Sequence, residues 1–323
     1  MKAKILITLL AIVAAAGCTI PGIQGITPGT TVGGGQGLEM TSFTAEPNTV
    51  YNGTTVRVVM DVENLGGTTV PNTYASFAYL TGSNINIVSS DNTYWHRLST
   101  DTDTTECFYF AKEMKPTDIV RGMPGDKKTF KWSLRAPDIL KGQTRPDSFM
   151  GRVYTDYQTS VNGNIWVYKE AEADAARASG RSLIKATFTS TSGPVAAEVS
   201  VSPDPVIIYG SDKTFSLNIK ISNLQTGTIY SPGVVTSCPP SSISTDDLNK
   251  VTLDITAPDF DFSADCSGAT PQELVSGKPT TVFCELTVKD ASVPTTFKSF
   301  PLTITVKYGY YTEKQAAVTI QGK

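Results

Sequence analysis

Two segments of the chain alternate apolar and polar side chains with a period of two, and each ends in the dipeptide Asn-Leu. The apolar positions are Val56, Val58, Met60 and Val62 in the first segment, and Phe215, Leu217, Ile219 and Ile221 in the second. Alternate residues of an extended chain point to the same face, so each segment is predicted to form a strand with one buried and one solvated face. A proline and a tyrosine-led turn precede both segments. This shared order indicates an internal duplication.

A second pair of alternating segments extends the repeat. Each runs into Ala-Pro-Asp, and their apolar residues are Phe130, Trp132 and Leu134 in the first half and Val251, Leu253 and Ile255 in the second. Each half is then expected to close with a hairpin. The first hairpin would turn at Asn162-Gly163-Asn164, and the second would turn near residues 312–314.

The composition agrees with an all-β chain. Of the 323 residues, 40% are hydrophobic and only 18% are charged, and the remainder is rich in Thr, Ser, Gly and Pro, which favour short strands joined by turns. The net charge of −3 gives no electrostatic reason to expect a nucleic-acid partner.

The N-terminus has the features of a signal peptide over residues 1–17. Lys2 and Lys4 precede an apolar run over residues 5–16, which is too short to span a bilayer comfortably, and small residues lead to Cys18. This arrangement resembles the lipobox of prokaryotic lipoproteins, which implies lipidation of Cys18 and anchoring to the outer face of the cell membrane. The alternative is a plain secretory signal followed by a chance cysteine. Residues 18–38 are expected to be a flexible tether, because they are rich in Gly, Pro and Thr.

The first repeated strand carries a family resemblance. The run Val62-Glu63-Asn64-Leu65-Gly66, after a Pro and a Tyr-x-Gly turn, resembles the CARDB-type immunoglobulin-like modules of archaeal and bacterial surface proteins. The second copy has Ile221 and Gln225 where the pattern has Val and Gly. The resemblance implies β-sandwiches of about seven strands, often in tandem, with roles in adhesion or display and no shared catalytic activity.

The expected organisation is therefore two tandem immunoglobulin-like antiparallel β-sandwich domains joined by one short helix. The domains are expected over residues 39–168 and 194–323, with a helix and connector over 169–193. Residues 170–179 are rich in Ala and charged side chains and stop at Gly180, as a short helix would. This helix would either pack on a neighbouring surface and set the angle between the domains, or lie in solvent.

The remaining cysteines are Cys107, Cys238, Cys266 and Cys284, and export makes disulfides permissible. We expect a bond between Cys266 and Cys284, which flank a Gly-containing connection compatible with adjacent strands. The state of Cys107 and Cys238, free or paired, stays open.

Few residues offer catalytic or metal-binding chemistry. His96 is the only histidine, and it is expected in a loop or at the surface. Asp101, Asp103 and Glu106 have carboxylates at a spacing that could bind calcium, although a plain acidic loop explains them as well. No other cofactor is expected, and no phosphate-binding or nucleophile-elbow motif occurs in the sequence.

Three further residues are candidates for contact or modification. Trp95 and Tyr311 are the best candidates for exposed aromatic contacts. Asn52 begins an Asn-Gly-Thr glycosylation sequon, although Asn-Gly is also ordinary turn chemistry.

These features predict a non-enzymatic cell-surface lipoprotein for adhesion, envelope structure or partner binding, and its partner would be another surface protein or a glycan. One alternative is a subunit of a surface filament or layer assembled by strand addition. The other is a carbohydrate-binding surface protein.

Overall fold

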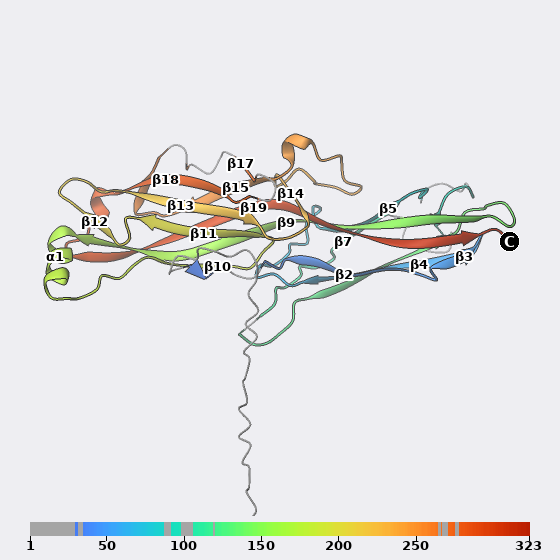
Figure 1. Cartoon of the computed structure of the whole chain (residues 1–323), viewed down its shortest axis with the longest axis horizontal. Coiled ribbons are helices and arrows are strands. Elements are labelled where there is room, and N and C mark those ends of the chain that lie inside the picture. The colour runs from blue at the N-terminus through green and yellow to red at the C-terminus, as the bar shows by residue number, and fades with distance from the viewer. Residues whose placement is uncertain are drawn as a thin grey trace, which may run out of the picture.

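The computed structural model is elongated and is built almost wholly of strands (Figure 1). It describes residues 30–31, 35–86, 92–97, 106–118, 120–263, 266, 271–274 and 278–323. Within these ranges there is one α-helix, and the long pairings are antiparallel. The prediction of an all-β chain is therefore confirmed.

Two very long strands form the axis of the molecule. Strand β9 (Thr144–Lys169) and strand β19 (Phe297–Gln321) pair antiparallel over their whole length, from Phe297 opposite Tyr168 to Gln321 opposite Thr144. Figure 1 shows this green and red ribbon running from one end of the molecule to the other.

A four-stranded sheet covers one half of this ribbon. Its order is β2 (Leu38–Glu46), β4 (Thr55–Asn64), β8 (Lys127–Arg135) and β6 (His96–Arg97). On the ribbon side, β5 (Phe77–Gly82) pairs with β9, β7 (Cys107–Tyr109) pairs with β5, and β3 (Thr49–Tyr51) pairs with β19. The layers are close, because a Cβ added at Gly151 of β9 would lie 2.6 Å from Met60 and 2.7 Å from Phe43. We call this half sandwich A.

The other half has the same arrangement, and we call it sandwich B. Its four-stranded sheet has the order β11 (Val195–Ser202), β13 (Thr214–Asn223), β18 (Thr280–Val288) and β16 (Phe260–Phe262). On the ribbon side, β15 (Lys250–Thr256) pairs with β19, β17 (Gln272–Glu273) pairs with β15, and β12 (Val206–Ile208) pairs with β9. Phe260 connects the layers, with ring centroids 5.3 Å from Phe215 and 5.4 Å from Phe300.

Three short strands complete the described sheets. Strand β10 (Thr187–Ser190) pairs with β9, and β1 (Thr30–Thr31) adds to β10 in the parallel sense. Strand β14 (Thr228–Tyr230) pairs with β19 near the middle of the molecule.

The two sandwiches exchange their last strands. Strand β9 begins in sandwich A, and its final residues pair with β12 of sandwich B. Strand β19 begins beside β15 in sandwich B, and its final residues pair with β3 of sandwich A. Each half of the sequence therefore completes the sandwich of the other half.

This exchange corrects the two closing hairpins expected from the sequence. Gly163 does not turn, since it pairs with Leu302 on one side and Phe188 on the other. Residues 312–314 do not turn either, because they pair with residues 151–153. The physical reason is that each segment pairs with the other long strand. Its backbone groups are thereby hydrogen-bonded without the chain turning back on itself.

The junction between the sandwiches is tightly packed, and we call it the waist. Tyr157 and Tyr308 lie opposite each other there, and the Tyr308 hydroxyl lies 3.1 Å from the Thr159 hydroxyl and accepts from the Val195 amide at 3.3 Å. A Cβ at Gly66 would lie 1.9 Å from the Tyr157 hydroxyl. Only glycine fits this approach of backbone to side chain.

Part of the expected tether belongs to this junction. The Leu65 amide donates to the Gly37 carbonyl at 2.9 Å, and β1 is paired with β10. The described residues of the segment are therefore packed against both sandwiches. Residues 18–29 and 32–34 lie outside the described residues.

The helix is present but does not lie between the sandwiches. Helix α1 (Glu170–Ala178) ends before Gly180, whose φ of +70° suits glycine. It lies at the outer end of sandwich B, beside β9 and β12 (Figure 1). Ala173 and Ala176 are buried against that end. The helix therefore covers an end of sandwich B and cannot set an angle between the two sandwiches.

Candidate binding surface at the waist

Four aromatic side chains form a row across the outer face of the sheet near the waist. Tyr109 of β7 lies opposite Phe77 of β5, which lies opposite Tyr154 of β9, which in turn lies opposite Tyr311 of β19. Ring centroids are 5.8 Å, 5.1 Å and 5.0 Å apart along this series. Residues directly opposite each other share a face of the sheet, so the register itself builds this aromatic row.

Tyr74 extends the row into solvent. It is 76% exposed, and its ring meets Tyr109 edge to face at 5.6 Å. Tyr109 is also exposed, whereas Phe77 and Tyr154 are buried. We count Tyr74 as part of the aromatic row from here on. Phe77 and Tyr154 form its buried part, which fixes the geometry, and Tyr74 and Tyr109 form its exposed end, which is open to a partner.

A polar row lies beside the aromatic row. Arg152 of β9 lies opposite Tyr79 on one side and Glu313 on the other. Its guanidinium donates to the Glu313 carboxylate at 2.9 Å and lies 5.6 Å from the Tyr311 ring centroid. The surface therefore offers flat rings next to a charged pair, which are the groups that proteins use to bind sugar rings or the side chains of a protein partner.

A loop from sandwich B covers the buried half of the row. Residues 231–244 connect β14 to the 3-10 helix η1 (Thr245–Asp247), and Val234, Val235 and Ile243 pack against Phe77, Tyr154 and Tyr230. A disulfide between Cys238 and Cys107 of β7 fastens this loop, and the Cys238 amide donates to the Tyr109 hydroxyl at 3.0 Å. The loop and the disulfide hold Tyr109 in place.

Burial shapes the acid–base properties of this face. It raises the pKa of the Tyr154 hydroxyl to about 12, against the opposing effect of Arg152. Burial also raises the pKa of Asp156, while the Gly233 amide lowers it. The Tyr230 hydroxyl has a raised pKa, first through burial and then through the negative charge of Asp156. Both tyrosine hydroxyls are therefore protonated and neutral at ordinary pH, and the buried Tyr230 hydroxyl has no hydrogen-bond partner among the described residues.

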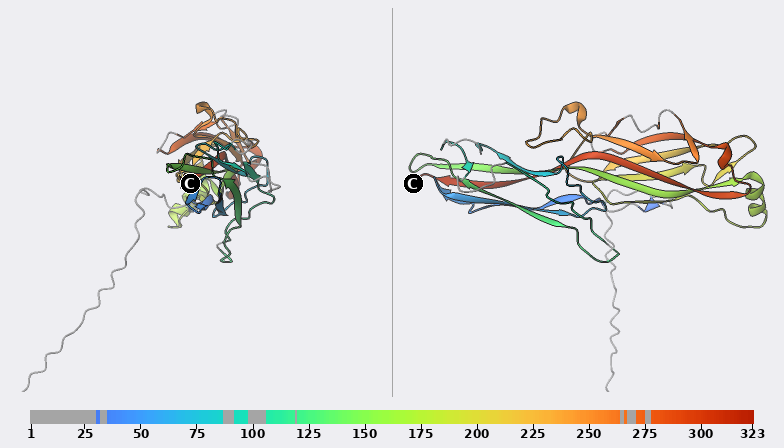
Figure 2. Two further views of the ribbon diagram at one scale, coloured as in Figure 1. Left: turned by 90° about the vertical axis from the view of Figure 1, so that its right-hand side faces the viewer. Right: turned by 180° about the vertical axis from the view of Figure 1, so that it is seen from behind.

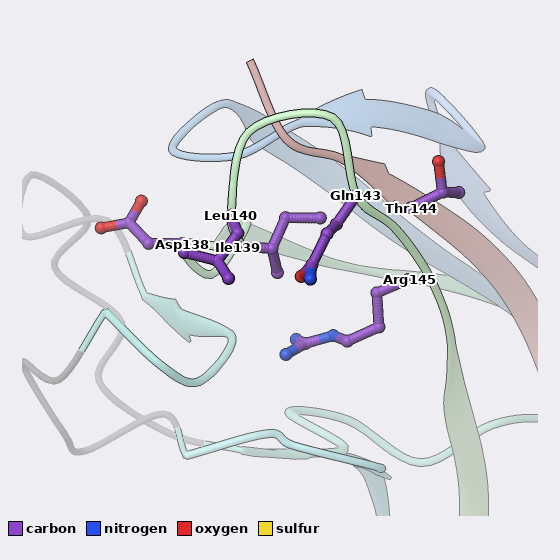
Figure 3. Close-up of a pocket in the computed structure, with 6 residues that line it drawn as sticks. All are labelled: Asp138, Ile139, Leu140, Gln143, Thr144 and Arg145. Carbon is purple, nitrogen blue, oxygen red and sulfur yellow. The ribbon is translucent and has the colours of Figure 1, made fainter.

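A separate open pocket of about 700 Å³ lies at the outer end of sandwich A, in the turn between β8 and β9 (Figure 3). Its lining consists of Asp138, Ile139, Leu140, Gln143, Thr144 and Arg145. The charge of Arg145 is already paired, because its guanidinium lies 2.9 Å from the buried Asp147 carboxylate. This pocket therefore offers a less distinctive set of groups than the aromatic row.

The structure corrects the prediction for Trp95 and qualifies that for Tyr311. Trp95 is fully buried, and its indole donates to Asp147 at 2.8 Å, so it is not an exposed contact. Its ring packs on Phe149 with centroids 4.9 Å apart, and the bond to Asp147 satisfies the indole N–H that burial takes out of water. Tyr311 is only half-buried, and it belongs to the aromatic row.

Sequence reasoning missed most of the row. The sequence gives no separate indication of Phe77, Tyr109 or Tyr154, although the Phe-x-Tyr spacing of β5 places the rings of Phe77 and Tyr79 on one face of a strand. That spacing was the one available signal.

The two disulfides use all four cysteines of the folded part. Cys266 is bonded to Cys284, the pair expected from the sequence. Cys107 is bonded to Cys238, a connection between the two halves of the chain with a sequence separation of 131. The question left open for these two cysteines is answered by the strand exchange, which brings β7 and the 231–244 loop together.

His96 is buried, which corrects its expected place at the surface. It lies in β6 opposite Arg135, and its Nδ1 is 3.1 Å from the Tyr94 carbonyl. It is buried because β6 pairs with β8 at the edge of the four-stranded sheet, and a strand of only two residues leaves no alternating pattern in the sequence.

The remaining candidates are placed only in part. Asp101 and Asp103 lie outside the described residues, as does Cys18, and Glu106 directly precedes β7. Among the described residues there is no cluster of three His, Cys, Asp or Glu side chains that could bind a metal. Asn52 lies in the turn after β3, where its side-chain oxygen accepts from the Lys323 amide at 3.0 Å.

No helix in the described ranges has the length and apolar character needed to cross a bilayer.

Comparison with known proteins gives no family assignment. No protein-family model matches the chain, and a search of curated proteins finds no match. The structure is similar to the adhesin InvE of Yersinia pseudotuberculosis, with 10% identity and a TM-score of 0.19 over 88% of this chain and 60% of that one. It is also similar to the native conformation of the E. coli alpha-2-macroglobulin, with 12% identity and a TM-score of 0.22 over 89% of this chain and 17% of that one. The chain spans less than two thirds of either protein, and neither likeness bears on function.

Proposed function

We propose that this protein is a non-enzymatic, lipid-anchored surface protein that binds a partner through the exposed end of the aromatic row. The observation that carries the proposal is the exchanged pair β9 and β19. Their continuous pairing makes one stiff body from two sandwiches and fixes the aromatic row at its middle. A rigid body with one preformed aromatic surface suits display and adhesion better than a hinged pair of domains would.

The two sandwiches fit a pair of duplicated immunoglobulin-like modules. In sandwich A the short strand β3 follows β2 and pairs in parallel with β19, and in sandwich B the short strand β12 follows β11 and pairs in parallel with β9. We place the protein outside the cytoplasmic membrane, where its two disulfides would persist.

The location is tested by intact-mass analysis of protein extracted from the membranes of its host. A chain that begins at a lipid-modified Cys18 is the expected result. An unmodified chain that still begins at Met1 contradicts anchoring.

The binding surface is tested with purified protein on a glycan array and on intact cell envelopes. Tyr74→Ala removes the most exposed ring of the row and is expected to abolish binding. The matched control is Tyr209→Ala, because Tyr209 is also exposed but lies directly after β12 in sandwich B. Equal binding by both variants contradicts a role for the aromatic row.

A second candidate function is a filament or layer subunit, and the pairing of β1 with β10 favours it. Thr30 and Thr31 already add in parallel to the edge of β10 within one chain. The same edge of a neighbouring copy would accept this segment equally well. Sedimentation at increasing concentration distinguishes the candidates, since a subunit of this kind forms polymers that disappear when residues 18–31 are removed.

A further inference from the structure

A narrow hairpin projects from the waist with apolar side chains at its tip. In the connection between β7 and β8, Asp118 and Met123 exchange two backbone hydrogen bonds of 3.0 Å, and residues 120–122 lie in the turn that these bonds close. Val120 is 97% exposed and Met123 is 50% exposed. The Val120 side chain is thus almost fully exposed, and that of Met123 is half exposed.

The base of the hairpin is firmly held. The Lys115 amide donates to the Asp126 carboxylate at 2.8 Å, and the Asp126 amide donates to the Lys115 carbonyl at 3.1 Å. The Thr117 amide also donates to the Gly66 carbonyl at the waist. The apolar tip is therefore presented by a supported backbone.

Basic residues outnumber acidic ones along the segment that contains the hairpin. Between residues 112 and 128 the chain has five basic residues and three acidic ones, whereas the whole chain has a net charge of −3. The basic residues are Lys112, Lys115, Arg121, Lys127 and Lys128, and all five are exposed. Two of these cations are paired, Arg121 with Asp118 at 3.7 Å and Lys127 with Glu63 at 3.1 Å. The excess of positive charge that remains along the segment makes an apolar tip complementary to an anionic lipid surface.

The hairpin lies on the same side of the molecule as β1. In Figure 1 and in the right view of Figure 2, the hairpin between β7 and β8 points downward from the waist, and β1 and β10 lie along the lower side of sandwich B. Only eleven residues lie between Cys18 and Thr30. Such a segment reaches at most about 40 Å when fully extended, so lipidation at Cys18 would hold this side of the protein near the bilayer.

We propose that Val120 and Met123 form a second membrane contact that inserts into the phospholipid headgroup region beside the lipid anchor. This inference rests on the proposed lipid anchoring. The two contacts together would lay the molecule along the membrane and orient the aromatic row in a fixed direction. One acyl chain alone binds weakly, so a second contact in the same molecule strengthens retention.

The test uses the full lipidated protein, reconstituted into phosphatidylcholine vesicles with and without phosphatidylglycerol, some carrying brominated acyl chains. Val120→Trp places a fluorophore at the tip. Phe283→Trp is the matched control, because Phe283 is 70% exposed on β18, on the opposite long side in Figure 1. The emission of wild-type protein supplies the background from its own tryptophans.

We expect brominated lipid to remove roughly half of the emission added by Val120→Trp, because interfacial side chains lie only about 5–10 Å deep. Phosphatidylglycerol should increase this loss, and Phe283→Trp should show none. Equal quenching of both variants, or none at Val120→Trp while the protein floats with the vesicles, overturns the hairpin contact alone. Wild-type protein that does not float overturns lipid anchoring, and the hairpin proposal with it.

Discussion

Asn64 ends strand β4 with a completely buried side chain. Its amide donates to the carbonyls of Thr68 and Met114, each at 2.9 Å, and its oxygen accepts from the Gly66 amide at 3.2 Å. Asn223 ends the duplicated strand β13, yet it is exposed, and its oxygen accepts from the Gln225 amide. Asn64 therefore links three backbone groups of sandwich A, whereas Asn223 at the matching position of sandwich B makes a hydrogen bond only to the residue two further along.

Asn64→Ala is therefore expected to lower the free energy of unfolding by about 2–3 kcal/mol, because it removes three hydrogen bonds made by one completely buried side chain. Asn223→Ala is the matched control, and we expect it to cost less than about 1 kcal/mol. Urea unfolding followed by fluorescence measures both. Equal losses for the two variants would show that burial of the Asn64 network does not matter.

The tyrosines at the waist predict how stability depends on pH. Burial raises the pKa of Tyr154 and Tyr157 to about 12 in the folded protein. In the unfolded chain a tyrosine loses its proton near pH 10. Above about pH 10 the unfolded state therefore releases protons that the folded state keeps, and stability falls by about 1.4 kcal/mol per pH unit for each tyrosine.

We expect the free energy of unfolding contributed by these tyrosines to stay constant below about pH 10 and to fall steeply between about pH 10 and 12. Denaturant titrations over this range, with tyrosinate absorbance as a second probe, measure the effect. Tyr157→Phe should make the fall less steep. Stability that does not change up to about pH 11 contradicts the assignment.

At the scale of elements, the sequence predicted strands well and their partners poorly. The alternating patterns at β4, β8, β13 and β15 mark real strands with the expected buried faces. The turn predicted at Asn162-Gly163-Asn164 is wrong, because Asn and Gly permit a turn but do not require one. Whether a strand pairs with the next segment or with one about 150 residues away depends on long-range contacts that no local pattern encodes.

The same limit applies to the aromatic row. Its rings come from β5, β7, β9 and β19, which are brought together only by the register of the exchanged strands. The 231–244 loop that covers the row belongs to the other half of the chain. The sequence identified Tyr311 as a contact candidate, but nothing local connects it with Tyr109.

The disulfide between Cys107 and Cys238 is expected to matter more than the one between Cys266 and Cys284. The sequence separations are 131 and 18. Closing these loops in the unfolded chain corresponds to about 5 and about 3 kcal/mol of stabilisation in the chain-entropy description. Replacing Cys107 and Cys238 by Ser should therefore lower the melting temperature further than replacing Cys266 and Cys284.

Limited proteolysis provides an independent check of this pair. Without the Cys107–Cys238 bond, the 231–244 loop should be cut faster, since only its apolar contacts and the hydrogen bonds from the Gly233 and Cys238 amides would hold it on the row. Loop cleavage at an unchanged rate would show that those contacts suffice.

At the scale of the whole molecule, strand exchange makes the two sandwiches one folding unit. A sandwich made from residues 39–168 alone would lack the end of β19, and one made from residues 194–323 would lack the end of β9. Both truncated halves would expose unpaired strand edges. Two independent tandem domains would show neither defect.

Cutting the connection between the halves distinguishes these cases. A protease site inserted between Ser182 and Leu183 lies in a mostly exposed segment after α1. The experiment uses the variant with Ser at positions 107 and 238, because the native disulfide would otherwise join the fragments. We expect the cut fragments to elute together and to unfold in a single transition, since the 25 paired positions of β9 and β19 still connect them. The uncut variant is the control, and fragments that separate without denaturant would mean that each half closes its own sandwich.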